Sequence, residues 1–203
     1  MYRKGKKPDY YTELAKKQNY PARSVYKLKE IDEKYCVFNK GNRVLDLGSA
    51  PGSWLLYVSK KVGSKGIVIG VDIDEIKIPK KNNIIFIKKS VFNFKENDFS
   101  ASGVGAGSGW KFDAVISDMA PKTSGIDFLD AGKSLELSEK AFKIAELFLK
   151  PGGNFVCKIF DSKESSDLFT EIKKSFEFSK RFKPKAVTKQ SKEFYIIGKG
   201  FKN

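Results

Sequence analysis

One stretch of nine residues, 46–54 (DLGSAPGSW), most constrains how this chain folds. It follows an apolar segment, 43–47, that is typical of a buried strand, and it leads into a segment, 52–61, whose apolar residues have helical spacing. A strand that runs through a glycine-bearing turn into a helix presents backbone N–H groups to a ligand. The turn lacks both the glycine spacing of dinucleotide-binding motifs and the Gly-Lys-Ser/Thr of phosphate-binding loops. We therefore expect a nucleoside-like ligand without a pyrophosphate.

Segments typical of strands and helices alternate along the chain. The predicted strands cover residues 43–47, 67–71, 84–87, 114–117, 154–159, 179–183 and 193–198, and the predicted helices cover 9–17, 22–34, 52–61, 129–149 and 165–176. This alternation predicts an α/β fold, with a mostly parallel seven-stranded sheet and helices on both of its faces. Ligands of such sheets bind beyond the carboxyl ends of the strands.

The chain is long enough to form one domain with its own core, and we expect a single domain over residues 1–203. Residues 1–38 are predicted to form a basic arm followed by helices. Residues 98–110 include a glycine- and serine-rich stretch, which we expect to be a flexible surface loop that cannot pack a core.

The charge of the chain is strongly unbalanced. It has 39 Lys and Arg residues against 24 Asp and Glu residues, a formal net charge of +15. A surplus of this size indicates a polyanionic partner, and nucleic acid is the favoured class. The alternative is compositional drift, because only four of the basic residues are arginine and lysine-rich chains also arise from A/T-rich codons.

Several classes of protein are excluded by what the chain lacks. Histidine is absent and the only cysteines are Cys36 and Cys157, so histidine chemistry and a four-cysteine zinc site are excluded and no metal is expected. No apolar run approaches the roughly 18 residues that span a membrane, and the basic N-terminus lacks the apolar core of a signal peptide. We expect a soluble intracellular protein without membrane contact, and the sequence leaves its compartment (cytoplasmic, nuclear or organellar) open.

Charged residues lie within or directly after three of the predicted strands. Asp72 follows the second strand, where a carboxylate can accept hydrogen bonds from both hydroxyls of a ribose; the alternative is that it caps a turn. Lys158 lies in an apolar strand, where an unpaired ammonium group is costly to bury; the alternative is an edge position from which it reaches solvent. Asp118, at the end of the neighbouring strand, could supply the opposite charge. These residues make the carboxyl edge of the sheet the predicted site.

Residues 46–54, together with residues 117–121 (SDMAP), closely resemble the FtsJ/RrmJ family of S-adenosylmethionine-dependent RNA ribose 2′-O-methyltransferases. The resemblance covers almost the whole chain and extends to residues 23–28, 151–153, 183–184 and 191–195. It implies a Rossmann-like methyltransferase fold and S-adenosylmethionine as the cofactor.

The hallmark of this family is a Lys-Asp-Lys-Glu tetrad, which the sequence matches at Lys27, Asp118, Lys158 and Glu193. A ribose 2′-hydroxyl is a poor nucleophile at neutral pH, so the protein must orient it and help to remove its proton. The resemblance implies that Lys158 is closest to a general base and that Asp118 orients it. Lys27 and Glu193 would complete the network by steering the hydroxyl and its neighbouring phosphate.

For the cofactor, the resemblance implies that the methionine end lies near Gly52 and Trp54 and the ribose near Asp72. For Trp54 the alternative is a core aromatic. The family usually has an acidic residue near the adenine, but this chain has residues 88–91 (KKSV) there, so Ser90 or the backbone would make that contact. The expected cofactor residues are Gly48, Pro51, Gly52, Ser53, Trp54, Asp72, Ser90 and Asp118.

RNA would be bound by residues 1–38, including Arg23 and Lys27, because basic side chains there neutralise phosphates. Within the family, large-subunit ribosomal RNA is the preferred substrate, free or in a ribosomal particle, and we expect a monomer. Two alternatives remain open. The chain could modify the tRNA anticodon loop, or it could be a non-catalytic RNA-binding protein on the same scaffold, although binding alone does not require the tetrad.

Overall fold

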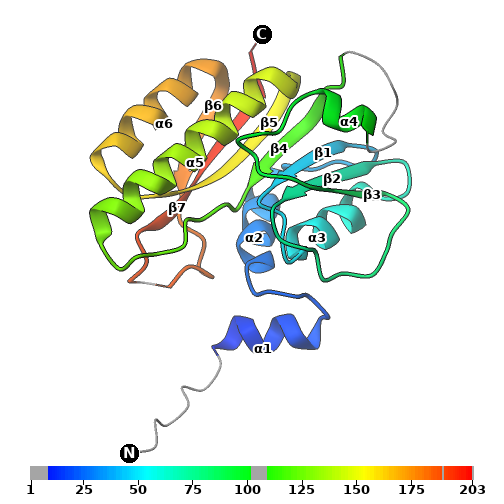
Figure 1. The fold of residues 1–203 in the computed structure, drawn as a ribbon, viewed down its shortest axis with the longest axis horizontal. Coiled ribbons are helices and arrows are strands. Elements are labelled where there is room, and N and C mark those ends of the chain that lie inside the picture. Colours follow the sequence, from blue (N-terminus) through cyan, green and yellow to red (C-terminus); the bar gives the residue numbers. More distant parts are fainter. Residues whose placement is uncertain (1–8, 102–108, 189, 203) are drawn as a thin grey trace, which may run out of the picture.

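The computed structural model describes residues 9–101, 109–188 and 190–202 (Figure 1). Most of the predicted basic arm, residues 1–8, lies outside these residues. Within them the strands form one seven-stranded sheet of order β3-β2-β1-β4-β5-β7-β6. β7 runs in the direction opposite to the other six strands, so it is antiparallel to both β5 and β6. The strands are β1 (Arg43–Leu47), β2 (Ile67–Asp72), β3 (Ile84–Lys88), β4 (Phe112–Ser117), β5 (Leu149–Phe160), β6 (Phe176–Phe182) and β7 (Glu193–Phe201).

Helices cover both faces of the sheet, so the predicted α/β architecture is confirmed (Figure 1). On one face α2 (Val25–Tyr35) and α3 (Ser53–Val62) pack on the sheet, with α1 (Tyr10–Lys17) beside them. On the other face lie α5 (Asp127–Phe148), α6 (Lys163–Ser175) and the short α4 (Asn97–Ala101). Alternate residues of each strand serve the two cores. In β1, for example, Val44 packs toward α2 and α3, whereas Leu45 packs toward α5.

The strand order reverses at β1, which has β2 on one side and β4 on the other. Such a reversal opens a crevice at the carboxyl edge, because the connections from the two strands leave toward opposite faces. The antiparallel β7 adds a second effect at this edge. Because it runs against β5, its first residue, Glu193, pairs with Phe160 at the carboxyl end of that strand.

The segment 98–110 differs from its prediction as a loop that cannot pack a core. Its first residues belong to α4, and Phe99 is only 2% exposed. The ring of Phe99 lies 5.1 to 5.4 Å from the rings of Phe94, Phe112 and Phe148. Burial of this aromatic side chain outweighs the loop propensity of the glycines that follow. The rest of the predicted loop, residues 102–108, lies outside the described residues.

Several element boundaries also differ from those predicted. The strand β5 already begins at Leu149 and includes the Pro-Gly-Gly segment 151–153, which was expected to separate helix from strand. The strand β6 begins at Phe176 instead of residue 179, because Phe176 pairs with Phe201 and stacks on Phe155. The helix α2 begins at Val25, three residues later than expected.

Candidate active site

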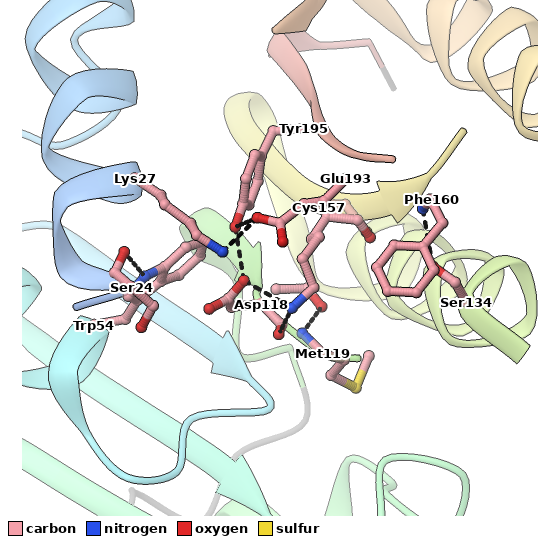
Figure 2. A network of polar contacts seen from close by, with 12 residues as sticks. Ser24, Lys27, Trp54, Asp118, Met119, Ser134, Cys157, Phe160, Glu193 and Tyr195 are labelled. Atoms are coloured by element: carbon pink, nitrogen blue, oxygen red, sulfur yellow. Dashed lines mark hydrogen bonds and ion pairs between the residues drawn. The ribbon is translucent and has the colours of Figure 1, made fainter. Parts of the chain in front are cut away.

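The four residues of the predicted tetrad come together at the carboxyl edge of the sheet (Figure 2). Lys27 comes from α2, Asp118 follows β4, Lys158 lies on β5 and Glu193 begins β7. Lys27 forms an ion pair with Glu193. Lys158 forms a second ion pair with Asp118, at 3.0 Å between Nζ and Oδ1. Segments far apart in the sequence therefore build one site.

The hydroxyl of Tyr195 links the two ion pairs. It lies 2.7 Å from Oδ1 of Asp118 and 3.1 Å from Oε1 of Glu193 (Figure 2). A hydroxyl has one proton, so it donates to one of these carboxylates at a time. Burial, and then the charges of Asp118 and Glu193, raise the pKa of Tyr195 well above its usual value. The hydroxyl therefore stays protonated at neutral pH and serves as a donor.

The sequence analysis missed Tyr195, although a signal was present. It stands two residues after Glu193 in the last predicted strand, and the alternation of side chains along a strand puts residues at this spacing on the same face. In the structure Tyr195 lies opposite Lys158 in the β5–β7 pairing and is fully buried.

Asp118 is held as a carboxylate by its neighbours. Burial alone would raise the pKa of Asp118, but the ammonium groups of Lys158 and Lys27 and the hydrogen bond from Tyr195 outweigh it, so the pKa lies below its usual value. Nζ of Lys158 also donates to the backbone oxygen of Asp118 at 2.5 Å. The result is a row of buried, coupled charges that can orient a hydroxyl group and exchange its proton.

A cavity of about 550 Å³ adjoins this row at Asp118. The turns after β1, β2, β3 and β4 contribute most of its lining, so it lies at the edge where the sequence predicted a ligand. The cavity has apolar walls, three carboxylates from Asp72, Asp74 and Asp118, and two ammonium groups from Lys89 and Lys122. Four of the predicted cofactor residues line it: Gly48, Asp72, Ser90 and Asp118.

Asp72 is fixed by two backbone contacts. Its Oδ2 accepts from the N–H of Ala50 at 2.8 Å, and its Oδ1 accepts from the N–H of Asp74 at 2.9 Å. The turn-capping and ligand-binding interpretations of Asp72 are therefore compatible, because each carboxylate oxygen has a further lone pair for the cavity. Ser90 lies across the same cavity, at the end of β3.

The other predicted cofactor residues do not line the cavity. Pro51 accepts through its backbone oxygen from the N–H of Lys77, and Gly52 lies where a Cβ would strike the side chain of Ile78. The hydroxyl of Ser53 accepts from the N–H of Ala22. Pro51 and Gly52 thus shape the turn before α3, and the side chain of Ser53, the first residue of this helix, makes a structural contact.

Trp54 occupies the core instead of the cavity. It is 2% exposed, its Nε1 donates to the backbone oxygen of Ser24 at 3.0 Å, and its ring packs near that of Tyr195 (Figure 2). The side chain of Trp54 therefore lies where the core-aromatic alternative places it, and the contact with the cofactor that the resemblance implies for this residue stays a prediction.

Asp46 is a second residue whose importance the sequence analysis missed. It is fully buried in β1, and neither carboxylate oxygen has a hydrogen-bond partner among the described residues. Burial, followed by the charges of Asp118 and Asp72, raises the pKa of Asp46 well above its usual value. A charged residue between apolar neighbours was the signal, as it was for Lys158. The carboxyl edge of β1, β2 and β4 thus concentrates acidic groups that a cationic ligand would stabilise.

The described residues lack two further features. No group of three or more acidic or cysteine side chains there is arranged to hold a metal ion. None of the helices in this part of the chain combines the length and apolar character required to cross a bilayer.

The fold and the cavity at its strand reversal define a protein of the Rossmann-like methyltransferase class. The sequence model of the FtsJ-like methyltransferases matches residues 20–201. The chain therefore belongs to the FtsJ-like methyltransferase family, and the predicted resemblance is confirmed.

Curated relatives and a solved structure agree with this family. The chain is 44% identical over 190 residues to ribosomal RNA large subunit methyltransferase E of Desulfatibacillum aliphaticivorans, covering 94% of this chain and 89% of that protein. It is 42% identical over 194 residues to the protein of the same name from Lawsonia intracellularis, covering 96% and 95%. A crystal structure of a ribosomal RNA methyltransferase from Plasmodium falciparum superposes with a TM-score of 0.77 at 28% identity, covering 90% of this chain and 98% of the other.

Proposed function

We propose that this chain transfers a methyl group from S-adenosylmethionine to a ribose 2′-hydroxyl of RNA, and that its substrate is large-subunit ribosomal RNA. The observation that carries the proposal is the position of Asp118, which belongs both to the charged row and to the cavity lining. A group bound in the cavity would therefore lie beside residues suited to activate a hydroxyl. The names of the curated relatives support the choice of RNA.

The cavity suits S-adenosylmethionine in size and charge. Its volume of about 550 Å³ falls in the range of small-molecule sites. S-adenosylmethionine supplies an electrophilic methyl group on a positively charged sulfur when it is bound. The carboxylates of Asp72 and Asp118, both in the cavity lining, would stabilise such a cation.

Individual residues would hold different parts of the donor. Asp72 would accept hydrogen bonds from the ribose hydroxyls, since its backbone contacts hold the carboxylate at the cavity. Ser90 lies where the next strand ends and would contact the adenine. Gly48, with a positive φ of 76°, forms the turn that leaves the cavity open at β1.

The charged row would act on the RNA hydroxyl. Lys158, held by two contacts to Asp118, would orient the 2′-hydroxyl. To serve as the base it would first release one of its own N–H protons to water, so that the lone pair of the resulting amine can take up the hydroxyl proton. Lys27 and Glu193, at the other end of the row, would position the nucleotide. Tyr195 would hold the two ion pairs in place through the hydrogen bonds of its hydroxyl. A positioned base of this kind contributes roughly 10²- to 10⁴-fold to a rate.

The proposal is tested by incubating the protein with radiolabelled S-adenosylmethionine and separate pools of large-subunit ribosomal RNA, small-subunit ribosomal RNA and tRNA. We expect label in the large-subunit RNA, and mass spectrometry of its nucleosides should identify 2′-O-methylribose. Label confined to tRNA would assign the other substrate within the family. Label on a base, or none in any RNA pool, would refute the proposed reaction.

A further inference from the structure

The edge of the sheet opposite the active site carries an open hollow of about 900 Å³. It lies where the strands β1 to β4 begin. Arg43 is the first residue of β1 and Ile67 the first of β2, while Asn83 directly precedes β3 and Trp110 stands just before β4. The hollow is therefore separate from the cavity that contains Asp118.

The side chains around this hollow are strongly basic. None of the described residues that line it is acidic, whereas five of them are cations: Arg43, Lys60, Lys65, Lys80 and Lys81. The cofactor cavity differs, because three carboxylates and two lysines share its lining. Cations gathered without carboxylates repel one another, and the repulsion is relieved when a polyanion binds.

An aromatic ring lies among these cations. The guanidinium of Arg43 is 4.6 Å from the ring centre of Trp110, in a cation–π contact. Guanidinium planes and aromatic rings are the surfaces on which unpaired RNA bases stack. The hollow thus combines phosphate-neutralising groups with a stacking surface, a combination that suits RNA better than an acidic protein segment.

We propose that this hollow binds a second segment of the RNA substrate, away from the nucleotide that is methylated. The inference rests on the proposed function and extends it. The five residues of β1 alone separate the two edges by about 16 Å. A trinucleotide in the active site, about 10 Å long when stacked, does not reach the hollow, but a long folded RNA can contact both edges. The enzyme then prefers large structured RNA through contacts remote from its chemistry.

A triple variant, Lys65→Gln with Lys80→Gln and Lys81→Gln, removes three cations of the hollow. The matched control is Lys163→Gln with Lys173→Gln and Lys174→Gln, which removes the same charge from exposed positions on α6. Binding to purified bacterial large-subunit ribosomal RNA is measured by filter binding, and binding to a trinucleotide, the short RNA, by equilibrium dialysis, each over a range of salt concentrations. S-adenosylmethionine binding and thermal unfolding establish that both variants are folded.

For the ribosomal RNA, we expect the hollow variant to bind at least tenfold more weakly, with a salt slope lower by about two. Binding to the short RNA should match that of the control variant. A further variant, Arg43→Lys, keeps the charge and loses the planar group, so its affinity for ribosomal RNA should fall severalfold with no change in slope. An unchanged affinity would refute the stacking role of Arg43.

Equal ribosomal RNA binding by the hollow and control variants would overturn the inference, as would an equal loss for the short and long RNAs. If the hollow bound an acidic protein segment instead of RNA, the hollow and control variants would bind ribosomal RNA equally and with the same salt slope. The lower salt slope expected for the hollow variant therefore distinguishes RNA from an acidic protein. Failure of the proposed function is a separate result, because it would appear as wild-type protein that transfers no methyl group to any RNA.

Discussion

Nζ of Lys158 lies 3.0 Å from Oδ1 of Asp118 and donates to the backbone oxygen of the same residue at 2.5 Å. Two contacts to one residue fix the direction of the ammonium group. A lysine has three N–H donors, so one position on Nζ is left for a further partner. Loss of Lys158 should therefore impair methyl transfer while the binding of S-adenosylmethionine is kept.

Replacing Lys158 with alanine should reduce the single-turnover rate of methyl transfer by about 10³-fold or more, because both orientation and proton removal are lost. S-adenosylmethionine binding, measured by calorimetry, should stay within a few fold of the wild-type value. Lys122→Ala is the matched control, since this exposed lysine also lines the cavity. Normal turnover by the Lys158 variant would remove it from the catalytic role.

Asp72→Asn should weaken S-adenosylmethionine binding by roughly 10- to 100-fold, because the variant loses a charged acceptor at the cavity. Equilibrium dialysis with labelled cofactor measures the change. Glu75→Gln, a nearby exposed substitution that also removes one negative charge, should leave the affinity close to wild type. Equal losses in the two variants would point to a general charge effect instead of ribose binding.

Asp46 should make the protein less stable as the pH rises. Its pKa is raised in the fold, and an ordinary aspartate in an unfolded chain titrates near pH 4. The carboxyl of Asp46 therefore keeps its proton to a higher pH in the folded state than in the unfolded chain. The stabilisation that this proton contributes is fully present below the unfolded pKa and is lost as the pH rises through the folded pKa. The loss is at most about 1.4 kcal/mol per pH unit.

Asp46→Asn removes this titration, so its unfolding free energy should vary less between about pH 5 and pH 8 than that of the wild type. Urea denaturation over this range measures the difference. Asp74→Asn replaces an exposed aspartate nearby and should follow the wild-type curve. Parallel curves for the wild type and the Asp46 variant would contradict the expectation.

Trp54→Phe tests whether Trp54 serves the core or the cofactor. The variant keeps an aromatic ring in the core but loses the hydrogen bond to Ser24. The free energy of unfolding should fall by about 1 kcal/mol or somewhat more, while the affinity for S-adenosylmethionine should change less than twofold. A large drop in the affinity for S-adenosylmethionine without a loss of stability would indicate instead that Trp54 contacts the cofactor.

The sheet and the tetrad could be predicted because each depends on local signals. Apolar runs separated by turn residues mark the strands, and the tetrad residues stand within motifs of a family. The burial of Phe99 could not be predicted, because it depends on aromatic partners from β4 and α5 that are distant in the sequence.

The cofactor residues were predicted less completely for a similar reason. Sequence proximity to a glycine turn does not say whether a side chain faces the cavity or the core. Asp72 faces the cavity, but Trp54, two residues beyond the second glycine, turns into the layer between α3 and the sheet. Asp46 carried the same burial signal as Lys158, yet its lack of a partner emerges only from the packing of β1 against its neighbours.

The antiparallel insertion of β7 between β5 and β6 also sets an order of events during synthesis. Every residue lining the nucleoside-sized cavity precedes α6 in the chain, whereas Glu193 and Tyr195 arrive with the last strand. A growing chain thus has the parts of its pocket well before it has the link between the two ion pairs. A chain that ends before residue 193 therefore contains every residue of the cavity lining but lacks Glu193 and Tyr195, which complete the charged row.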